Sequence, residues 1–190
     1  MAVTAPSLNL GSGSIGAVLA GGTLTTFGTN TDLVTVLGSN TYTGRTVLAG
    51  STLAVPSLAN GGLASGVGSS SANPTNLLFA GGGLSYTGPT ATTDRGYAID
   101  GGGIFSVSGD LTLLGQVAAT AGAFNKGGPA TLKYARTGTN ILTAGNYQIG
   151  QGTVLFDGGA STPGNYLQTN RINGELWIGY DQVNAGAMIL

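Results

Sequence analysis

The acidic side chains that could do chemistry are concentrated between residues 94 and 110. Asp94 is followed directly by Arg95, and Asp100 and Asp110 come later in the same stretch. A suitably spaced pair of carboxyl groups cleaves glycosidic bonds, so a glycan-active enzyme is one hypothesis. The alternative is an Asp–Arg pair on a turn, followed by two aspartates that mark turns beside glycine. Because the chain has only seven acidic residues, we favour the turns and expect no catalytic residue and no enzyme.

Cysteine and histidine are both absent. Their absence excludes an imidazole base, a thiolate nucleophile and a Cys/His zinc site. The glycine runs open no expected helix and are not followed by Lys-Ser/Thr, so they are expected to be corners rather than phosphate loops. The glycine- and aspartate-rich calcium repeat is also missing. We therefore expect neither a metal site nor a cofactor.

The charge balance limits the partners of the chain. Six basic and seven acidic residues give a net charge of −1, which leaves no basic face for nucleic acid. Lys126, Lys133 and Arg136 form the one basic cluster, and we expect a solvated strand face there, with a weak acidic partner as the alternative. No apolar stretch is long enough to cross a bilayer, so no membrane span is expected.

The composition favours a folded, all-β chain. Glycine accounts for 36 of 190 residues, 41% of residues are hydrophobic and 7% are charged, which is unlike a disordered chain. Short stretches alternate apolar residues with Thr or Ser and end at Gly, Asn or Asp, as strands do. The best helical candidate, residues 115–123, is short and equally compatible with a loop. Strands are predicted at 23–27, 32–37, 46–49, 52–55, 76–79, 83–86, 104–107, 110–114, 131–134, 140–143, 147–149, 153–156 and 175–178.

Two stretches of the chain share a pattern. Leu37–Val55 and Thr137–Phe156 both read Gly-(Ser/Thr)-Asn-x-(Tyr/Leu)-Thr, then a short apolar strand, then glycine and a strand that begins with threonine. Sharp corners about every 20 residues are typical of a solenoid. We predict a short parallel β-helix (solenoid) of seven or eight rungs, with a β-sandwich or jelly roll as the alternative. Its parts are an N-terminal arm or cap (1–20), the solenoid (21–172), and a C-terminal strand with an apolar tail (173–190).

The segment Asn40-Thr-Tyr-Thr-Gly-Arg-Thr-Val-Leu-Ala-Gly-Ser-Thr-Leu53 resembles the autotransporter-associated β-strand repeat of bacterial passenger domains. That repeat reads Asn-x-Tyr-Thr-Gly-Gly-Thr, a short strand and Gly-Thr-Leu, so Arg45 stands where glycine is usual. Residues 77–95 and 99–104 also look like the stretch that follows such repeats. The resemblance implies a right-handed parallel β-helix that is secreted and often adhesive.

The two ends of the chain suggest a free-standing protein. Autotransporters begin with a signal peptide and end in a membrane barrel, and we expect neither in a chain that opens at Met1 and closes at Leu190. By analogy with phage and virus surface proteins, the first functional hypothesis is a non-enzymatic capsid decoration (cement) or fibre-type protein on the virion surface. The alternative is an autotransporter passenger fragment that acts as an adhesin at the bacterial cell surface.

The terminal rungs of a solenoid need caps or partners. The chain ends on large apolar residues, which are costly to leave exposed, so we predict that contacts between subunits are made here, by Trp177, Tyr180, Met188, Ile189 and Leu190. The expected partners are the chain itself, as a homotrimer, and major capsid or other virion proteins. Surface glycans that stack on tyrosines are a further candidate. Alternatively, the tail folds back over its own last rung.

Overall fold

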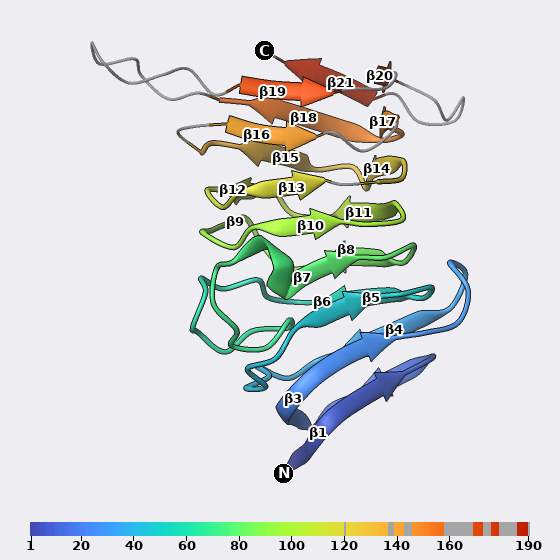
Figure 1. Ribbon diagram of the computed structural model, residues 1–190, viewed down its shortest axis with the longest axis vertical. Coiled ribbons are helices and arrows are strands. Elements are labelled where there is room, and N and C mark those ends of the chain that lie inside the picture. The colour runs from blue at the N-terminus through green and yellow to red at the C-terminus, as the bar shows by residue number, and fades with distance from the viewer. Residues whose placement is uncertain are drawn as a thin grey trace.

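The computed structural model describes residues 1–119, 121–136, 139–142, 146–157, 169–172, 176–178 and 186–189 of the chain. In these residues the backbone winds into a coil of stacked parallel strands (Figure 1). Each turn of the coil, here called a rung, adds one strand to each of two long sheets. From the fourth rung onward it also adds a strand to a third sheet.

The strands are short and are grouped by the side of the coil on which they lie. The first sheet contains β1 (Ala2–Leu10), β3 (Val18–Thr26), β5 (Thr46–Leu48), β7 (Leu77–Phe79), β10 (Tyr97–Ile99), β13 (Val117–Ala119), β16 (Thr139–Leu142) and β19 (Thr169–Ile172). The second contains β2 (Gly13–Ile15), β4 (Leu33–Val36), β6 (Thr52–Val55), β8 (Gly83–Tyr86), β11 (Gly103–Val107), β14 (Phe124–Gly127), β17 (Tyr147–Ile149) and β20 (Leu176–Ile178). The third contains β9 (Ala91–Thr93), β12 (Leu111–Leu113), β15 (Thr131–Tyr134), β18 (Gly152–Phe156) and β21 (Gly186–Ile189).

The register between rungs is parallel and regular. Leu78 of β7 pairs with Ala98 of β10, and Ala98 pairs with Ala118 of β13, so one rung takes 20 residues here. Each long sheet has eight strands, which confirms the prediction of a parallel β-helix with seven or eight rungs. The parallel pairing between named strands also excludes the β-sandwich and jelly-roll alternatives, whose sheets are antiparallel.

The corner between the first and second sheets requires glycine on successive rungs. Gly102, with φ +87°, and Gly122, with φ +84°, lie in the β10–β11 and β13–β14 turns. A Cβ atom on Gly122 would lie 2.1 Å from the backbone nitrogen of Gly102. Neither the positive φ nor this close approach allows a side chain, which confirms the expectation that the glycine runs form corners.

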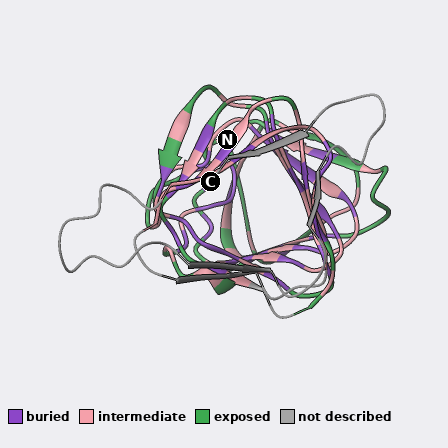
Figure 2. Ribbon diagram, turned by 90° about the horizontal axis from the view of Figure 1, so that it is seen from above, coloured by how far each residue is buried: buried purple, intermediate pink, exposed green. Residues whose placement is uncertain are grey.

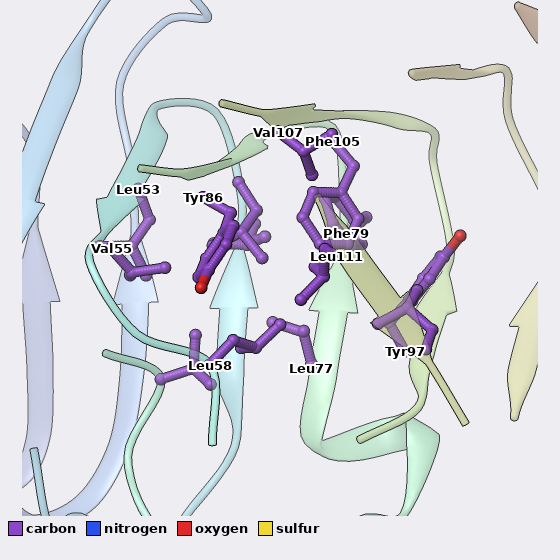
Figure 3. Close-up of a cluster of buried hydrophobic side chains, with 14 of the residues drawn as sticks. Leu53, Val55, Leu58, Leu77, Phe79, Tyr86, Tyr97, Phe105, Val107 and Leu111 are labelled. Atoms are coloured by element: carbon purple, nitrogen blue, oxygen red, sulfur yellow. The ribbon is translucent and has the colours of Figure 1, made fainter. Parts of the chain in front are cut away.

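The core is a continuous column inside the coil, and Figure 2 shows that buried segments recur around the coil. Alternation along each strand places the buried residues there: in β10, Tyr97 and Ile99 are buried while Ala98 between them is half-buried. Aromatic rings fill the middle rungs, and Phe79 packs edge-to-face on Tyr97 with centroids 5.4 Å apart. Phe105 lies in the same cluster (Figure 3), with its ring 5.8 Å from that of Phe79.

Residues 1–20 contain β1, β2 and the beginning of β3, and their role as a cap stays a prediction. The structure differs from the sequence expectations in two places. The helical candidate 115–123 contains strand β13. The two similar stretches are not equivalent in register. The apolar strand of Leu37–Val55 is β5 in the first sheet, whereas the corresponding strand of Thr137–Phe156 is β17 in the second. Their likeness therefore reflects common corner and strand chemistry rather than one repeated rung.

Candidate functional site

A long loop leaves the coil between β6 and β7. We call residues 56–76 the folded loop; it ends in a short 3₁₀ helix, η1 (Pro74–Asn76). Leu58 and Val67 of this loop are buried in the hydrophobic core. The loop closes the third side of the early rungs, where the described residues contain no strand of the third sheet.

The side chain of Arg95 holds the folded loop in place. It is 3% exposed and follows β9, the first strand of the third sheet. Its Nε donates to the Ala59 carbonyl at 2.7 Å and its Nη1 to Ser70 Oγ at 3.1 Å. Its Nη2 donates to the carbonyls of Gly68 at 2.9 Å and Leu63 at 3.1 Å. One guanidinium therefore satisfies carbonyls that an irregular loop cannot pair with its own backbone.

The electrostatic surroundings of Arg95 are unusual for a surface loop. Burial lowers the pKa of the Arg95 guanidinium, while the charge on Asp94 and the Tyr42 hydroxyl nearby oppose that shift. Arginine nevertheless stays charged in proteins. A buried cation of this kind is tolerated because its donors are matched by acceptors.

The acidic residues of the same stretch make separate contacts. The Asp94 carboxylate accepts from the Gly61 backbone N–H at 2.7 Å, within the folded loop. The Asp110 carboxylate accepts from the Thr131 N–H at 2.8 Å and so joins two rungs. Asp100 is exposed in the β10–β11 turn. These contacts fit the turn interpretation of the stretch.

The repeat-like motif around residue 40 lies against the folded loop. The Asn40 side chain is fully buried; its Oδ1 accepts from the Leu19 N–H at 2.9 Å, and its Nδ2 donates to the Gly66 carbonyl at 3.1 Å. The buried Tyr42 hydroxyl bonds Thr46 Oγ1 at 2.7 Å. The motif thus connects the second rung, the third rung and the folded loop.

Arg45, which stands where the repeat usually has glycine, also contacts this region. Its side chain is exposed, and its Nε donates to the Thr75 carbonyl in η1 at 2.8 Å. The preceding Gly44 allows the close approach of the rung below, because a Cβ there would lie 2.6 Å from the Gly22 carbonyl carbon. The substitution therefore adds a tether to the folded loop without disturbing the corner.

Lys126 interrupts the apolar column of the later rungs. It lies in β14, where its backbone pairs with Phe105 of β11 and Ile149 of β17, both buried. The lysine itself is 0% exposed. The expectation of a solvated strand face is therefore wrong for this residue, because its position in the strand alternation directs it into the coil.

The ammonium of Lys126 is held by backbone carbonyls at the corner between the second and third sheets. Its Nζ donates to Gly128 at 2.7 Å, Ala130 at 2.6 Å and Gln151 at 2.9 Å. Burial lowers the pKa of the Lys126 ammonium to about 8, and the Asp110 carboxylate opposes that shift. The Lys126 ammonium therefore binds backbone carbonyls within the fold and is not exposed on the surface.

The other members of the expected basic cluster lie outside the core. Lys133 is partly exposed and forms an ion pair with Asp157 at 2.5 Å. Arg136 is partly exposed as well. The three basic residues therefore do not form one charged surface.

The described tyrosines belong to the core and not to an exposed stacking surface. Those at positions 42, 86, 97, 134 and 147 are all buried, so the expectation that glycans stack on tyrosines is wrong for these five. The hydroxyl groups of Tyr97 and Tyr134 are 2.5 Å apart, and those of Tyr134 and Tyr147 are 3.0 Å apart. Tyr166 and Tyr180 lie outside the described residues.

The described residues form hollows on the outer surface. One, of about 310 Å³, follows the glycine corner between the first and second sheets, and we call it the corner groove. A second, of about 290 Å³, lies on the third sheet beside Asp110 and Lys133. Neither hollow was predicted from the sequence, because each is lined by residues from several rungs. The glycine runs were nevertheless a usable signal for the first.

The predicted partner contacts near the C-terminus are described only in part. Trp177 in β20 occupies the register position beside Gln148, and Met188 and Ile189 in β21 pair with Val154 and Leu155. Tyr180 and Leu190 lie outside the described residues. The contact role of these five residues stays a prediction.

Comparison with known proteins gives one informative match. Over 135 residues, 66% of the chain, the sequence is 39% identical to the adhesin BmaC autotransporter of Brucella suis biovar 1 (strain 1330). The chain spans 4% of the length of that protein. No family model matches the chain, and no solved structure matches it. No helix in the described part of the chain is long and apolar enough to span a membrane. The resemblance to autotransporter repeats is therefore supported by a curated relative that is itself an autotransporter adhesin.

Proposed function

We propose that the chain is a passenger-type segment of a bacterial autotransporter adhesin and acts at the cell surface. The observation that carries this proposal is its 39% identity to an autotransporter adhesin over two thirds of the chain. The parallel coil supports it, because the motif that resembles the passenger repeat connects two rungs and the folded loop through Asn40 and Tyr42. Adhesion itself is carried over from the relative and is a proposal for this chain.

The proposed mechanism is presentation on a rigid support. Stacked strands fix the spacing between rungs at about 4.8 Å, so side chains on successive rungs keep their relative positions. The corner groove therefore keeps a fixed place and shape on this support. Binding by such a surface needs no catalytic group, which agrees with the structural use of Asp94 and Asp110.

The virion-surface role predicted from the sequence receives no support from the comparisons. That prediction was based on where this sequence begins and ends. Because the chain spans only 4% of its relative, these positions indicate nothing about what precedes or follows it. The homotrimer was predicted from the apolar C-terminal residues, and both it and the capsid partners stay predictions. We therefore propose the bacterial surface in place of the virion.

Surface display tests the proposal. The chain is fused to a membrane-anchoring autotransporter barrel in a non-adherent bacterium, and attachment of the bacteria to cultured epithelial cells and to extracellular-matrix proteins is counted. We expect several-fold more attachment than with the barrel alone. Resistance of the displayed chain to added protease shows that it is folded. A folded, displayed chain that attaches no better than the barrel alone would overturn the adhesin role.

A further inference from the structure

The corner groove runs along the coil across several rungs. One wall is made by the stacked turns between the first and second sheets, including Gly81, Gly101 and Gly102. The end toward the N-terminus is bordered by Asn30, from the turn between β3 and β4. Because the turns are glycine-rich, the wall exposes peptide groups with no side chains over them.

The other wall of the corner groove is a column of residues on the second sheet. Ile104 of β11 pairs with Asn125 of β14, which pairs with Gln148 of β17. All three line the groove. Neighbouring strands lie about 4.8 Å apart, so the column presents one apolar and two amide side chains at regular intervals along the coil.

The described lining of the groove is uncharged and combines amide with apolar side chains. Asn30, Asn125 and Gln148 supply the amides, and no lysine, arginine, aspartate or glutamate is among the lining residues that the structure describes. The Oδ1 atom of Asn125 is buried against Gly150 of the next rung and accepts no hydrogen bond among the described residues, so it is not itself a contact for a ligand.

An extended peptide is disfavoured as the occupant. Peptides that add to a sheet bind to an unpaired strand edge. Beside the groove, β11 is paired on both sides, with β8 and β14, and β14 is paired with β11 and β17. A ligand must therefore bind through side chains and turn peptides, and groups that donate and accept at once match amides best.

We infer that the corner groove binds an uncharged glycan. Sugar hydroxyls donate and accept as the amides do, the carbon–hydrogen face of a sugar ring packs on Ile104, and the glycine wall lets the ring approach the backbone. The volume of about 310 Å³ is at the lower end for ligand sites, which suits a short terminal portion of a glycan. The inference rests on the proposed adhesin function and names the ligand class for one of its surfaces.

A blocking substitution tests the groove directly. Ala123 is exposed and lines the groove, so Ala123→Trp fills the space without entering the core. Ala64→Trp, at an exposed position in the folded loop, is the matched control. Both variants and the unaltered chain are measured by interferometry against immobilised neutral oligosaccharides ending in mannose, galactose, fucose or N-acetylglucosamine, and against sialylated counterparts. Thermal melting confirms that both variants are folded.

The expected result is binding to at least one neutral glycan, weakened at least tenfold by Ala123→Trp and changed less than twofold by Ala64→Trp. Gln148→Ala should weaken the same binding. Absence of binding to every neutral glycan, binding only to sialylated glycans, or equal binding by Ala123→Trp and the unaltered chain would each overturn the inference.

The same variants separate this inference from the proposed function. If the displayed chain attaches bacteria to cells and Ala123→Trp attaches them equally well, the groove inference fails while the adhesin role stands. If Ala123→Trp abolishes glycan binding but the displayed chain attaches no bacteria, the adhesin role fails while the groove stands.

Discussion

The third side of the coil is built in two different ways. In the early rungs it is closed by the folded loop, whereas in the later rungs it is a five-stranded parallel sheet. Among the described residues each arrangement has one buried cation beside it: Arg95 at the loop, and Lys126 at the corner where the second sheet meets the third. The strands of the sheet satisfy one another through their ladder, but the loop has no such ladder.

The two cations differ in how much of the neighbouring backbone they hydrogen-bond. Arg95 donates to groups spread from residue 59 to residue 70, which is most of the folded loop. Lys126 donates to three carbonyls at one corner. A guanidinium has five N–H donors in a fixed plane, and an ammonium has three on a flexible stem. The irregular folded loop is held by the larger donor set of a guanidinium, whereas the third sheet, whose strands pair with one another, needs an ammonium only at one corner.

The largest expected effect comes from Arg95→Met, which retains most of the side-chain volume but no donor. Four hydrogen bonds from a charged donor would be lost, and the carbonyls of Ala59 and Gly68 would retain only the hydroxyls of Thr93 and Ser65 as donors. Hydrogen bonds to charged groups contribute about 1.5–3 kcal/mol each. We expect the free energy of unfolding to fall by at least about 3 kcal/mol, and protease cleavage to appear within residues 56–76. Urea denaturation and mass mapping of the fragments measure the two effects.

Arg95→Lys sharpens this comparison, because it preserves the charge and removes the fork of donors. Its loss of stability should lie between those of the unaltered chain and Arg95→Met. If Arg95→Met leaves the loop resistant to protease, the loop is held by Leu58 and Val67 and not by the guanidinium.

A smaller effect is expected from the titration of Lys126. Its pKa is about 8 when folded, below the ordinary 10.5, so between these values the unfolded chain binds more protons and stability rises with pH. From pH 8 to pH 9.5 we expect a gain of about 1.5 kcal/mol. The gain is measured by denaturation at each pH as the difference between the unaltered chain and Lys126→Met.

The upper limit of pH 9.5 avoids the tyrosines. Burial raises the pKa values of Tyr97, Tyr134 and Tyr147 well above 10, so their contribution to stability is present below pH 10 and is lost above it. An unaltered chain whose stability runs parallel to that of Lys126→Met from pH 8 to pH 9.5 would show that the lysine is not desolvated.

The smallest effect is expected within the regular rungs. Tyr134→Phe removes the hydroxyl that bonds both Tyr97 and Tyr147, while the ring stays packed 5.2 Å from Phe156. We expect a loss of about 1 kcal/mol, measured by the same denaturation. A loss as large as that of Arg95→Met would mean that the hydroxyl chain, and not strand stacking, supports the later rungs.

Much of the fold could be predicted from local patterns. Short alternating stretches such as 83–86 and 131–134 became strands β8 and β15, because alternation and glycine corners are local properties of the sequence. Strand β13 was missed because its Val-Ala-Ala sequence has no β-specific signal, and its state is set by pairing with β10. Pairing with the neighbouring strand therefore determined the conformation of these residues, and local propensity did not.

The candidate sites were less predictable, because they depend on contacts between distant rungs. Nothing near Arg95 in the sequence indicates that its partners lie at residues 59–70. The inward direction of Lys126 depends on a register that a shift of one residue would reverse. The corner groove combines Asn30 with Gln148, so it becomes visible only when the coil is assembled.

The gathering of aromatic rings in the middle rungs has a consequence for how the chain comes apart. In a coil each rung touches mainly the rungs directly above and below it, so local loss of structure spreads by steps. Phe79, Tyr97, Phe105 and Phe124 pack together at the centre of this series. Fraying should therefore advance inward from the extremities and stall at the rings, so that a shortened chain retains a folded kernel.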